Sequence, residues 1–257
     1  MKLVLALLAF SALASPALAW ERGRPASVTF THGFGGQCNG CDLSGRSMDG
    51  ARLAGGSFNG ANLSGSRLRR SEVSGSTFAG ADFSRSELTG SEISGSNFAS
   101  ALFQGACLER VEATGVNFSG ANLAATTVGG AEFVGANFAA ASLMGERGER
   151  TVFSGSNLAR ADLSRSALPG ADFGGANLAG ARLSEANLER ADFSGANLSR
   201  VRAPGARLAR ARLNEANIAA ADLSGAQGLT QDQINDACGD AATRLPNGLV
   251  VRTCRRR

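Results

Sequence analysis

Residues 171–200 read ADFGG-ANLAG-ARLSE-ANLER-ADFSG-ANLSR, six blocks of five residues in one register. Each block begins with Ala, carries Leu or Phe at its third position, and ends in Gly, Glu or Arg. The register extends without a slip over residues 41–225, which is 185 residues or 37 blocks (185/5). The third position is apolar in every block except at Gly148, and the first is small except at Arg46 and Glu146. The fold must therefore bring a small and a large residue to the same side once in every block.

An apolar period of five fits neither a regular helix nor a continuous strand. Five residues turn about 500° around an α-helix, so successive apolar positions would spread around its circumference. The faces of a strand alternate with a period of two, so a step of five would reverse the apolar side each time. A corner in every block removes the conflict. The first and third residues then point inward, and the fifth, which is often Gly, takes the corner backbone.

Longer correlations predict four blocks per coil. Phe recurs every twenty residues in two columns, and Asn recurs at the same interval in a column outside the core that we expect to be exposed. Residues twenty apart would stack vertically, with the coils spaced near ~4.8 Å by backbone hydrogen bonds. In so thin a rod we expect roughly one aromatic ring per layer, with small residues opposite to keep the interior dense. The first Phe column is Phe58, Phe78, Phe98, Phe118 and Phe138; the second is Phe133, Phe153, Phe173 and Phe193; the Asn column is Asn97, Asn117, Asn137, Asn157, Asn177, Asn197 and Asn217.

Blocks of the form Ala-[Asp/Asn]-[Leu/Phe]-x-x, such as 61–65 and 176–180, resemble the pentapeptide-repeat family over the whole register. The resemblance implies an all-β fold, a right-handed quadrilateral β-helix. With four blocks per coil, the 37 blocks predict about nine coils, with short caps at the two ends. It also implies a protein without a catalytic site. Some cytosolic members of the family mimic DNA and bind type II topoisomerases, and many have no known function. The predicted organisation is a signal peptide (1–19), an N-terminal segment and cap (20–40), the β-helix (41–225) and a C-terminal capping segment (226–257).

The N-terminus predicts export. Lys2 precedes an apolar run, Leu3–Leu13, that is too short to span a bilayer, and a small-x-small cleavage site follows at Ala17–Ala19. Cleavage after Ala19 leaves a mature chain that begins at Trp20. We therefore expect a periplasmic or secreted protein without a transmembrane segment.

The N-terminal end of the β-helix carries two cysteines. An open β-helix exposes unpaired strand edges, so both ends need covers. Cys38 and Cys41 fall on inward positions of the first coil and are either small core residues or a local disulfide. A metal or redox role for this Cys-x-x-Cys pair would need further ligands or a βαβ context, which the sequence does not provide.

The C-terminal segment predicts a second cap. Residues 230–233, Thr-Gln-Asp-Gln, fit a capping box that opens a short helix through about Ala237. Cys238 and Cys254 flank the only non-repeat segment long enough to fold over the last coil. Since disulfides persist outside the cytosol, pairing of these two is the simplest hypothesis, and it leaves Cys107 free.

The sequence lacks the residues that most catalysis needs. His32 is the single histidine, and Lys2 is the single lysine. Histidine triads, histidine metal clusters and histidine acid–base pairs are therefore excluded or incomplete. The mature chain also has no lysine for a phosphate loop or a Schiff base. We predict no enzyme activity, no cofactor and no catalytic residue.

Charge is balanced along the repeats. Residues 41–225 contain 18 Arg and 18 acidic residues, and the basic excess lies at the ends, which argues against nucleic acid as a partner. Stacked carboxylates about 5 Å apart repel by on the order of 1 kcal/mol per pair in water. One column of the repeats carries stacked acidic side chains, and a column of Arg lies two residues before it in the sequence. We expect the Arg side chains to neutralise the acidic ones. The alternative is that the acidic column is a weak metal site for Ca²⁺ or a site for a basic partner. The acidic column is Glu72, Glu92, Glu112 and Glu132; the Arg column is Arg70, Arg110, Arg150, Arg190 and Arg210.

One block departs from the pattern. Residues 146–150, Glu-Arg-Gly-Glu-Arg, have a charged first residue and an empty core position. We interpret the block as a bulged or looped-out corner, either a tolerated local defect or a protrusion that binds a partner.

Two functions remain open. The first is a non-enzymatic structural or interaction solenoid of the bacterial periplasm or exterior, which binds an unknown protein or envelope component and can form a homodimer. The second is a DNA-mimicking inhibitor of a type II topoisomerase. That mechanism needs a strongly acidic surface in the cytosol, whereas this solenoid is neutral and follows an export signal.

Overall fold

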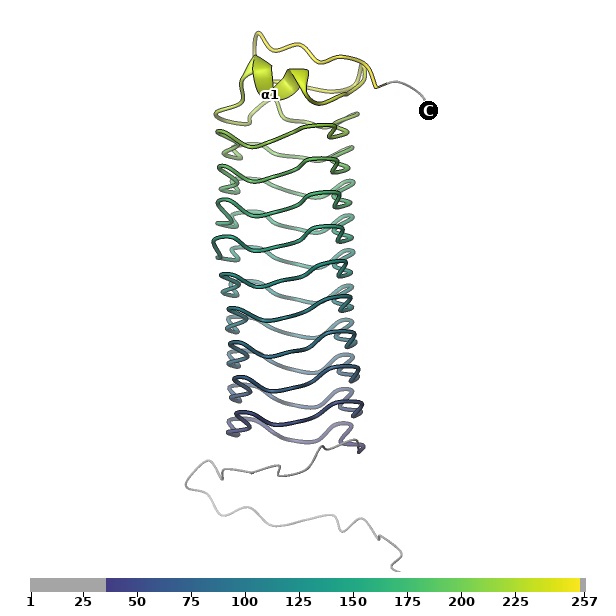
Figure 1. Cartoon of the computed structure of the whole chain (residues 1–257), viewed down its shortest axis with the longest axis vertical. Helices are drawn as coiled ribbons and strands as arrows, with labels where there is room; N and C mark the ends of the chain where they lie inside the picture. The colour runs from purple at the N-terminus through teal and green to yellow at the C-terminus, as the bar shows by residue number, and fades with distance from the viewer. Residues whose placement is uncertain (1–35, 255–257) are drawn as a thin grey trace, which may run out of the picture.

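The computed structural model describes residues 36–254. The predicted signal peptide with its cleavage site, and also His32, lie outside these residues. Figure 1 shows a stack of coils, with helix α1 (Gln231–Asn235) in the segment that covers the C-terminal end. Each coil has four sides, because a corner recurs every five residues and the coils repeat every twenty. Function therefore has to be sought on the walls, edges and ends of this stack.

Parallel β-bridges between residues twenty apart join the coils. The first is Gln37 with Ser57, and the second position of each block bridges the second position four blocks later as far as Arg207 with Gln227. Every bridge stands alone between two turns, so the described residues form no strand longer than a single bridge. Helix α1 is the single regular element among these residues. Each wall is too short for a longer ladder because a corner follows every bridge. The β-helix thus consists of single bridges stacked along the rod.

A left-handed backbone makes the corners. Every fifth-position residue from Gly40 to Ala220 has φ between 54° and 71°. Gly adopts this conformation freely, whereas Arg, Glu, Ala or Ser there costs on the order of 1 kcal/mol each. The corner N–H donates to the next coil, as from Gly80 to the Ala99 carbonyl at 2.9 Å. This regular bond helps to offset the strain.

All five backbone N–H groups of a regular block have partners. Two donate to the next coil, one to the preceding coil, and one closes the turn. The N–H at the fourth position donates to the Asn or Asp side chain at the second, which explains the preference for those residues there. Around block 96–100 the bonds are Asn97 N to Ser76 O (2.8 Å), Phe98 N to Asn117 O (2.7 Å), Ala99 N to Asn97 Oδ1 (3.1 Å), Ser100 N to Ser119 O (2.9 Å) and Ala101 N to Phe98 O (3.0 Å).

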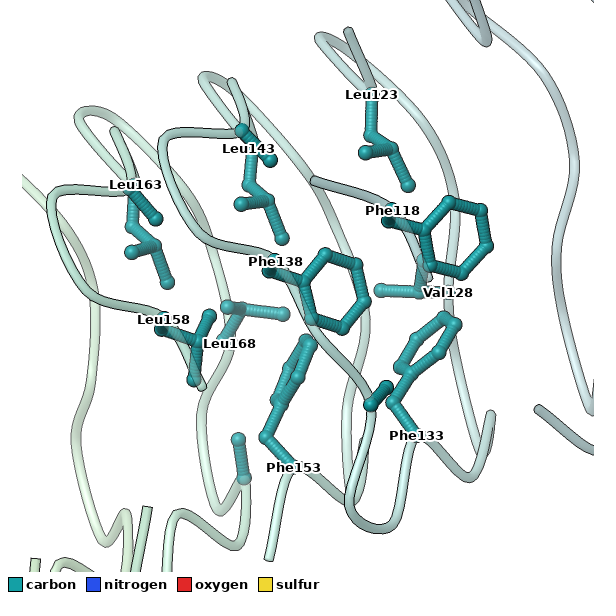
Figure 2. Close-up of a cluster of buried hydrophobic side chains, with 14 of the residues drawn as sticks. Phe118, Leu123, Val128, Phe133, Phe138, Leu143, Phe153, Leu158, Leu163 and Leu168 are labelled. Atoms are coloured by element: carbon teal, nitrogen blue, oxygen red, sulfur yellow. The ribbon is translucent and has the colours of Figure 1, made fainter. Parts of the chain in front are cut away.

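Stacked aromatic rings fill the interior. All nine Phe residues of the two predicted columns are at most 1% exposed. Within each column the ring centroids of successive coils lie 4.7–5.3 Å apart. Figure 2 shows where the columns overlap, with Phe118 and Phe138 facing Phe133 and Phe153.

The expectation of roughly one aromatic ring per layer is wrong. Phe83 and Phe103 form a third, shorter stack with centroids 4.8 Å apart, and both are fully buried. Each meets the first column edge to face, as where Phe83 lies 5.5 Å from Phe98 at an interplanar angle of 72°. This arrangement places the positive edge of one ring against the negative face of the other, so two rings fit in one coil.

The Asn column is half-buried, which corrects the expectation that it is exposed. Asn157 Oδ1 accepts from the Ala159 N–H and from Asn177 Nδ2, both at 3.2 Å, and Asn157 Nδ2 donates to Asn137 Oδ1 at 3.1 Å. The same pattern links Asn97 through Asn217. The column is therefore an amide ladder that adds side-chain bonds to the backbone bonds between coils.

Helix α1 and its flanks cover the last coil. Thr230 and Gln233 form the predicted capping box, and the helix ends at Asn235, two residues short of the expected Ala237. Gln233 Nε2 donates to the carbonyls of Leu208 (3.0 Å) and Ala211 (2.7 Å). The Ala211 carbonyl, which has no backbone donor at the end of the rod, thus has a partner, and the Leu208 carbonyl gains a second donor beside the Ala211 N–H.

Disulfides lie at both ends of the described rod. Cys238 bonds to Cys254 in the C-terminal cap, and Cys38 bonds to Cys41 in the first coil. Cys107 is the one free cysteine among the described residues. Both ends of the stack are consequently cross-linked within their own coil or cap.

Phe98→Ala tests the core. It should lower the free energy of unfolding by ~3–5 kcal/mol because it empties a site between two stacked rings. Asn157→Ala, which removes two ladder bonds and the bond from the Ala159 N–H, should cost only about 1–2 kcal/mol. Thermal and urea unfolding of both variants measure the difference, and equal losses would contradict this assignment of core and wall.

Cys238→Ser tests the C-terminal cap. The disulfide closes a loop of sequence separation 16, so its loss should cost roughly 3 kcal/mol. The loss should be local, since each coil of a solenoid contacts only its neighbours. Hydrogen exchange should rise around Ile218 and Leu223 and stay unchanged around Phe98. Uniform loss of protection along the rod would exclude a capping role.

Candidate functional site

The predicted acidic column lies on one wall. Glu72, Glu92, Glu112 and Glu132 are bridged in succession, each directly above the one before, and all four side chains are exposed. Across residues 36–254, no three or more His, Cys, Asp or Glu residues come together in a geometry that could hold a metal ion. The four carboxylates thus form a line rather than a cluster.

The predicted neutralisation of this column by the Arg column is wrong. None of the five predicted Arg residues forms an ion pair with a carboxylate in the described part of the chain. Instead Glu72 pairs with Arg52 at 3.4 Å, and Arg52 belongs to the same column one coil earlier. Asp192 lies farther along the same column and pairs with Arg212, which belongs to the column one coil later. Ion pairs on this wall therefore run along the rod.

Backbone geometry explains the error. The predicted Arg residues occupy left-handed corners, with φ between 54° and 59°. A Cβ on Gly90 would lie 3.8 Å from Arg70 Cγ, and one on Gly130 would lie 3.6 Å from Arg110 Cγ. The Arg stems thus run along the edge over the glycine corner of the next coil. Their guanidinium groups are not carried across the wall to the carboxylates.

The irregular block 146–150 does not bulge or protrude, contrary to the sequence interpretation. Arg147 bridges both Thr127 and Ala167, so the twenty-residue register continues through it. Glu146 points inward and is 0% exposed. A Cβ on Gly148 would lie 2.7 Å from Val128 Cγ2 and Thr151 Oγ1, so no side chain fits there. The empty core position and the oversized first residue compensate for each other.

Glu146 is a carboxyl group without a charged neighbour. Thr126 Oγ1 lies 3.4 Å from Glu146 Oε1, whereas Oε2 has no hydrogen-bond partner. Ser166, at the equivalent position one coil later, is buried with an unpartnered hydroxyl. Burial raises the pKa of Glu146 to about 8, because the charged form loses its hydration without gaining a cation. The group is therefore mostly protonated at neutral pH.

Shallow troughs follow the edges of the rod. One contains paired charges: Arg69 contacts Asp49 at 2.7 Å and Glu87 at 3.7 Å. The hydrogen bond from Arg69 holds the pKa of Asp49 below its usual value. A second trough is lined by Ala139, Ala140, Ala159, Arg160, Ala179, Gly180 and Arg200. Its two Arg residues make no ion pair with any described residue.

Sequence reasoning missed this second trough. A signal was present, because Arg160 and Arg200 stand at fifth positions forty residues apart with Gly180 between them. Forty residues are two coils, so the spacing alone places the two Arg on one edge. The direction of their side chains depends on the left-handed corner and needed the structure.

Comparison with known proteins identifies the family. A family model described as pentapeptide repeats matches in eight copies, over residues 37–75, 67–105, 117–145, 131–166, 156–195 and 191–227. These segments cover more than half of the sequence, and the chain belongs to the pentapeptide-repeat family. Proteins of this family form right-handed quadrilateral β-helices, in agreement with the stacked four-sided coils described above.

Several solved structures are similar at low identity. HetL, a pentapeptide repeat protein involved in heterocyst differentiation regulation from the cyanobacterium Nostoc sp. strain PCC 7120, is 27% identical, with 82% of this chain and 91% of HetL covered and a TM-score of 0.44. QnrB1, a plasmid-mediated fluoroquinolone resistance protein, is 20% identical, with 80% and 92% covered and a TM-score of 0.43. A pentapeptide repeat protein from the Arabidopsis thaliana thylakoid lumen is 24% identical, with 40% and 66% covered and a TM-score of 0.30. A search of curated proteins finds no match.

Glu146→Gln tests the buried carboxyl. The pKa of Glu146 is about 8 in the folded protein and 4.5 ordinarily, so between these values the folded state keeps a proton that the unfolded chain has released. The contribution of this group to stability is thus complete below pH 4.5 and is lost as pH rises through about 8. The total loss is of the order of a few kcal/mol.

Urea unfolding of both proteins across this pH range measures the effect. The unfolding free energy of the Glu146→Gln variant minus that of the natural chain should grow as pH rises and level off above the folded pKa. Parallel pH profiles would show that Glu146 does not titrate in the core.

Proposed function

We propose that this chain is an exported, non-enzymatic rod of the bacterial periplasm or exterior that acts by binding through its walls and edges. Its partner is a protein or a component of the cell envelope. Proteins of the family are generally structural or interaction proteins rather than enzymes, which supports this class of function.

The pair of disulfides is the observation that carries the proposal. Cys38–Cys41 and Cys238–Cys254 lie at opposite ends of the described stack. Disulfides form and persist in oxidising compartments and are rare in the cytosol. Together with the apolar run and small-x-small site of residues 1–19, they favour export.

The filled interior supports binding rather than catalysis. Rings and aliphatic side chains occupy the core from Met48 to Leu223, so the coils enclose packed side chains and contact partners only from outside. Residues 36–254 contain no helix of the length and apolarity that crossing a membrane requires. A rigid solenoid with flat walls suits recognition of an extended partner, since its side chains are already ordered before binding.

Inhibition of a topoisomerase by DNA mimicry is the weaker alternative. It draws on the presence of QnrB1, a plasmid-mediated fluoroquinolone resistance protein, among the similar structures. Mimicry requires a surface dominated by negative charge. The 18 Arg of residues 41–225 balance their 18 acidic residues, so the charge pattern does not favour it.

N-terminal sequencing and thiol counting test the proposal together. Expressed with its own N-terminus in a Gram-negative host, the chain should be recovered from the periplasm beginning at Trp20. Under denaturing, non-reducing conditions it should show one reactive thiol, at Cys107, because the other four cysteines are paired. A functional cytosolic protein that retains Met1 and has five free thiols would overturn export and revive the topoisomerase alternative.

A further inference from the structure

The trough between Arg160 and Arg200 combines strain with unpaired charge. Arg160 has φ of 60° and Arg200 of 58°, while Gly180, at the same corner of the coil between them, has φ of 70°. Gly is the least strained residue at such a corner. A Cβ on Gly180 would lie 3.8 Å from Arg160 Cγ, so the Arg160 stem runs along the edge over Gly180 toward Arg200. The two guanidinium groups thus belong to one line on one edge.

The neighbouring wall adds positive charge. Arg182 and Arg202 are bridged to each other one coil apart, directly beside the Arg160–Arg200 edge. Arg182 pairs with Asp162 at 3.6 Å, whereas Arg202 makes no ion pair with a described residue. The nearby Asp222 is engaged by Arg244 at 3.7 Å. Three guanidinium groups around the trough therefore lack an anionic partner among the described residues.

The other side of the trough offers neutral donors. It borders the Asn ladder, where Asn157, Asn177 and Asn197 each use one Nδ2 hydrogen on the preceding Asn. An amide nitrogen has two hydrogens, so each of these half-buried Asn side chains has a second N–H without a partner among the described residues. The floor between the donors and the guanidinium groups is made by Ala139, Ala159 and Ala179, which leave room for a ligand to lie along the rod.

We infer that this trough binds an extended anionic polysaccharide. Guanidinium groups match carboxylates in geometry and charge, and the amide ladder matches sugar hydroxyl groups. Arg160 and Arg200 are two coils apart, roughly 10 Å, which suits a polymer with one acid group on every second sugar. Duplex DNA has one charge per ~1.7 Å of axis and needs a broader basic surface. The inference rests on the proposed function and names the chemistry of its partner.

Binding of size-fractionated hyaluronate oligosaccharides, which carry one carboxylate per disaccharide, tests the inference with the full chain. Fluorescence polarisation at low salt should detect binding, and dextran, a neutral polysaccharide, should not compete. The double variant Arg160→Gly with Arg200→Gly should bind about tenfold more weakly or worse, since two charge-assisted contacts are lost. Gly is already the common corner residue, so this variant should fold.

A matched control separates the site from net charge. Arg70→Gly with Arg110→Gly makes the same two changes at left-handed corners, but on the edge beside the acidic column. It should change the affinity by less than about threefold, because these positions lie outside the trough. Equal weakening by both double variants would reduce the effect to net charge and overturn the inference. Equally tight binding of duplex DNA, or no hyaluronate binding at all, would also overturn it. Recovery of the chain from the periplasm beginning at Trp20 would still support the proposed function in that case.

Discussion

The left-handed corner is the constraint on which the whole rod depends. A block of five residues can bury its first and third side chains only if the fifth reverses the wall, and from Gly40 to Ala220 the fifth residue does so with positive φ. The same corner directs its N–H to the coil above, where the Gly80–Ala99 bond of 2.9 Å is typical. The corner residue of each block therefore determines three things together: which side chains are buried, where the chain turns and how successive coils stack. This coupling allows a narrow interior of rings and small residues to remain dense over many coils.

That coupling also fixes what the surface can present. A corner residue other than Gly projects along the edge, so its stem needs room over the next coil. Three Arg residues meet this need, because the corner one coil later is a glycine, with Cγ to Cβ-position distances of 3.6–3.8 Å: Arg70 with Gly90, Arg110 with Gly130 and Arg160 with Gly180. At these three positions the alternation of Arg and Gly gives a charge repeat of two coils, and it spaces like charges farther apart than adjacent coils would. The alternation ends at Arg190 and Arg210, which occupy corners of adjacent coils.

Much of this architecture could be predicted from the sequence because it is periodic. The columns of Phe and Asn give the twenty-residue stacking, and Thr230 with Gln233 gives the capping box. Phe83 and Phe103 were equally visible, but their edge-to-face packing depends on ring orientation, which a one-letter pattern does not encode. The compensation between Glu146 and Gly148 could not be predicted, because each looks like a defect alone. The direction of the Arg side chains could not be predicted for a similar reason. The spacing of the Arg residues shows that they share an edge, but it does not show where a side chain points when its backbone is left-handed.

Disulfides at both ends change where such a rod breaks. Repeat proteins ordinarily lose structure from their terminal units inward. Here Cys38–Cys41 and Cys238–Cys254 each stabilise the structure within an end coil or cap, and the coil that contains Glu146 lies between them with an unpartnered carboxyl oxygen in its core. Above about pH 8, where Glu146 loses its proton, unfolding should begin at the coil that contains this residue. The rod would then separate into two parts, each with one disulfide. Lifetime in the presence of proteases would then depend on one internal coil rather than on the ends.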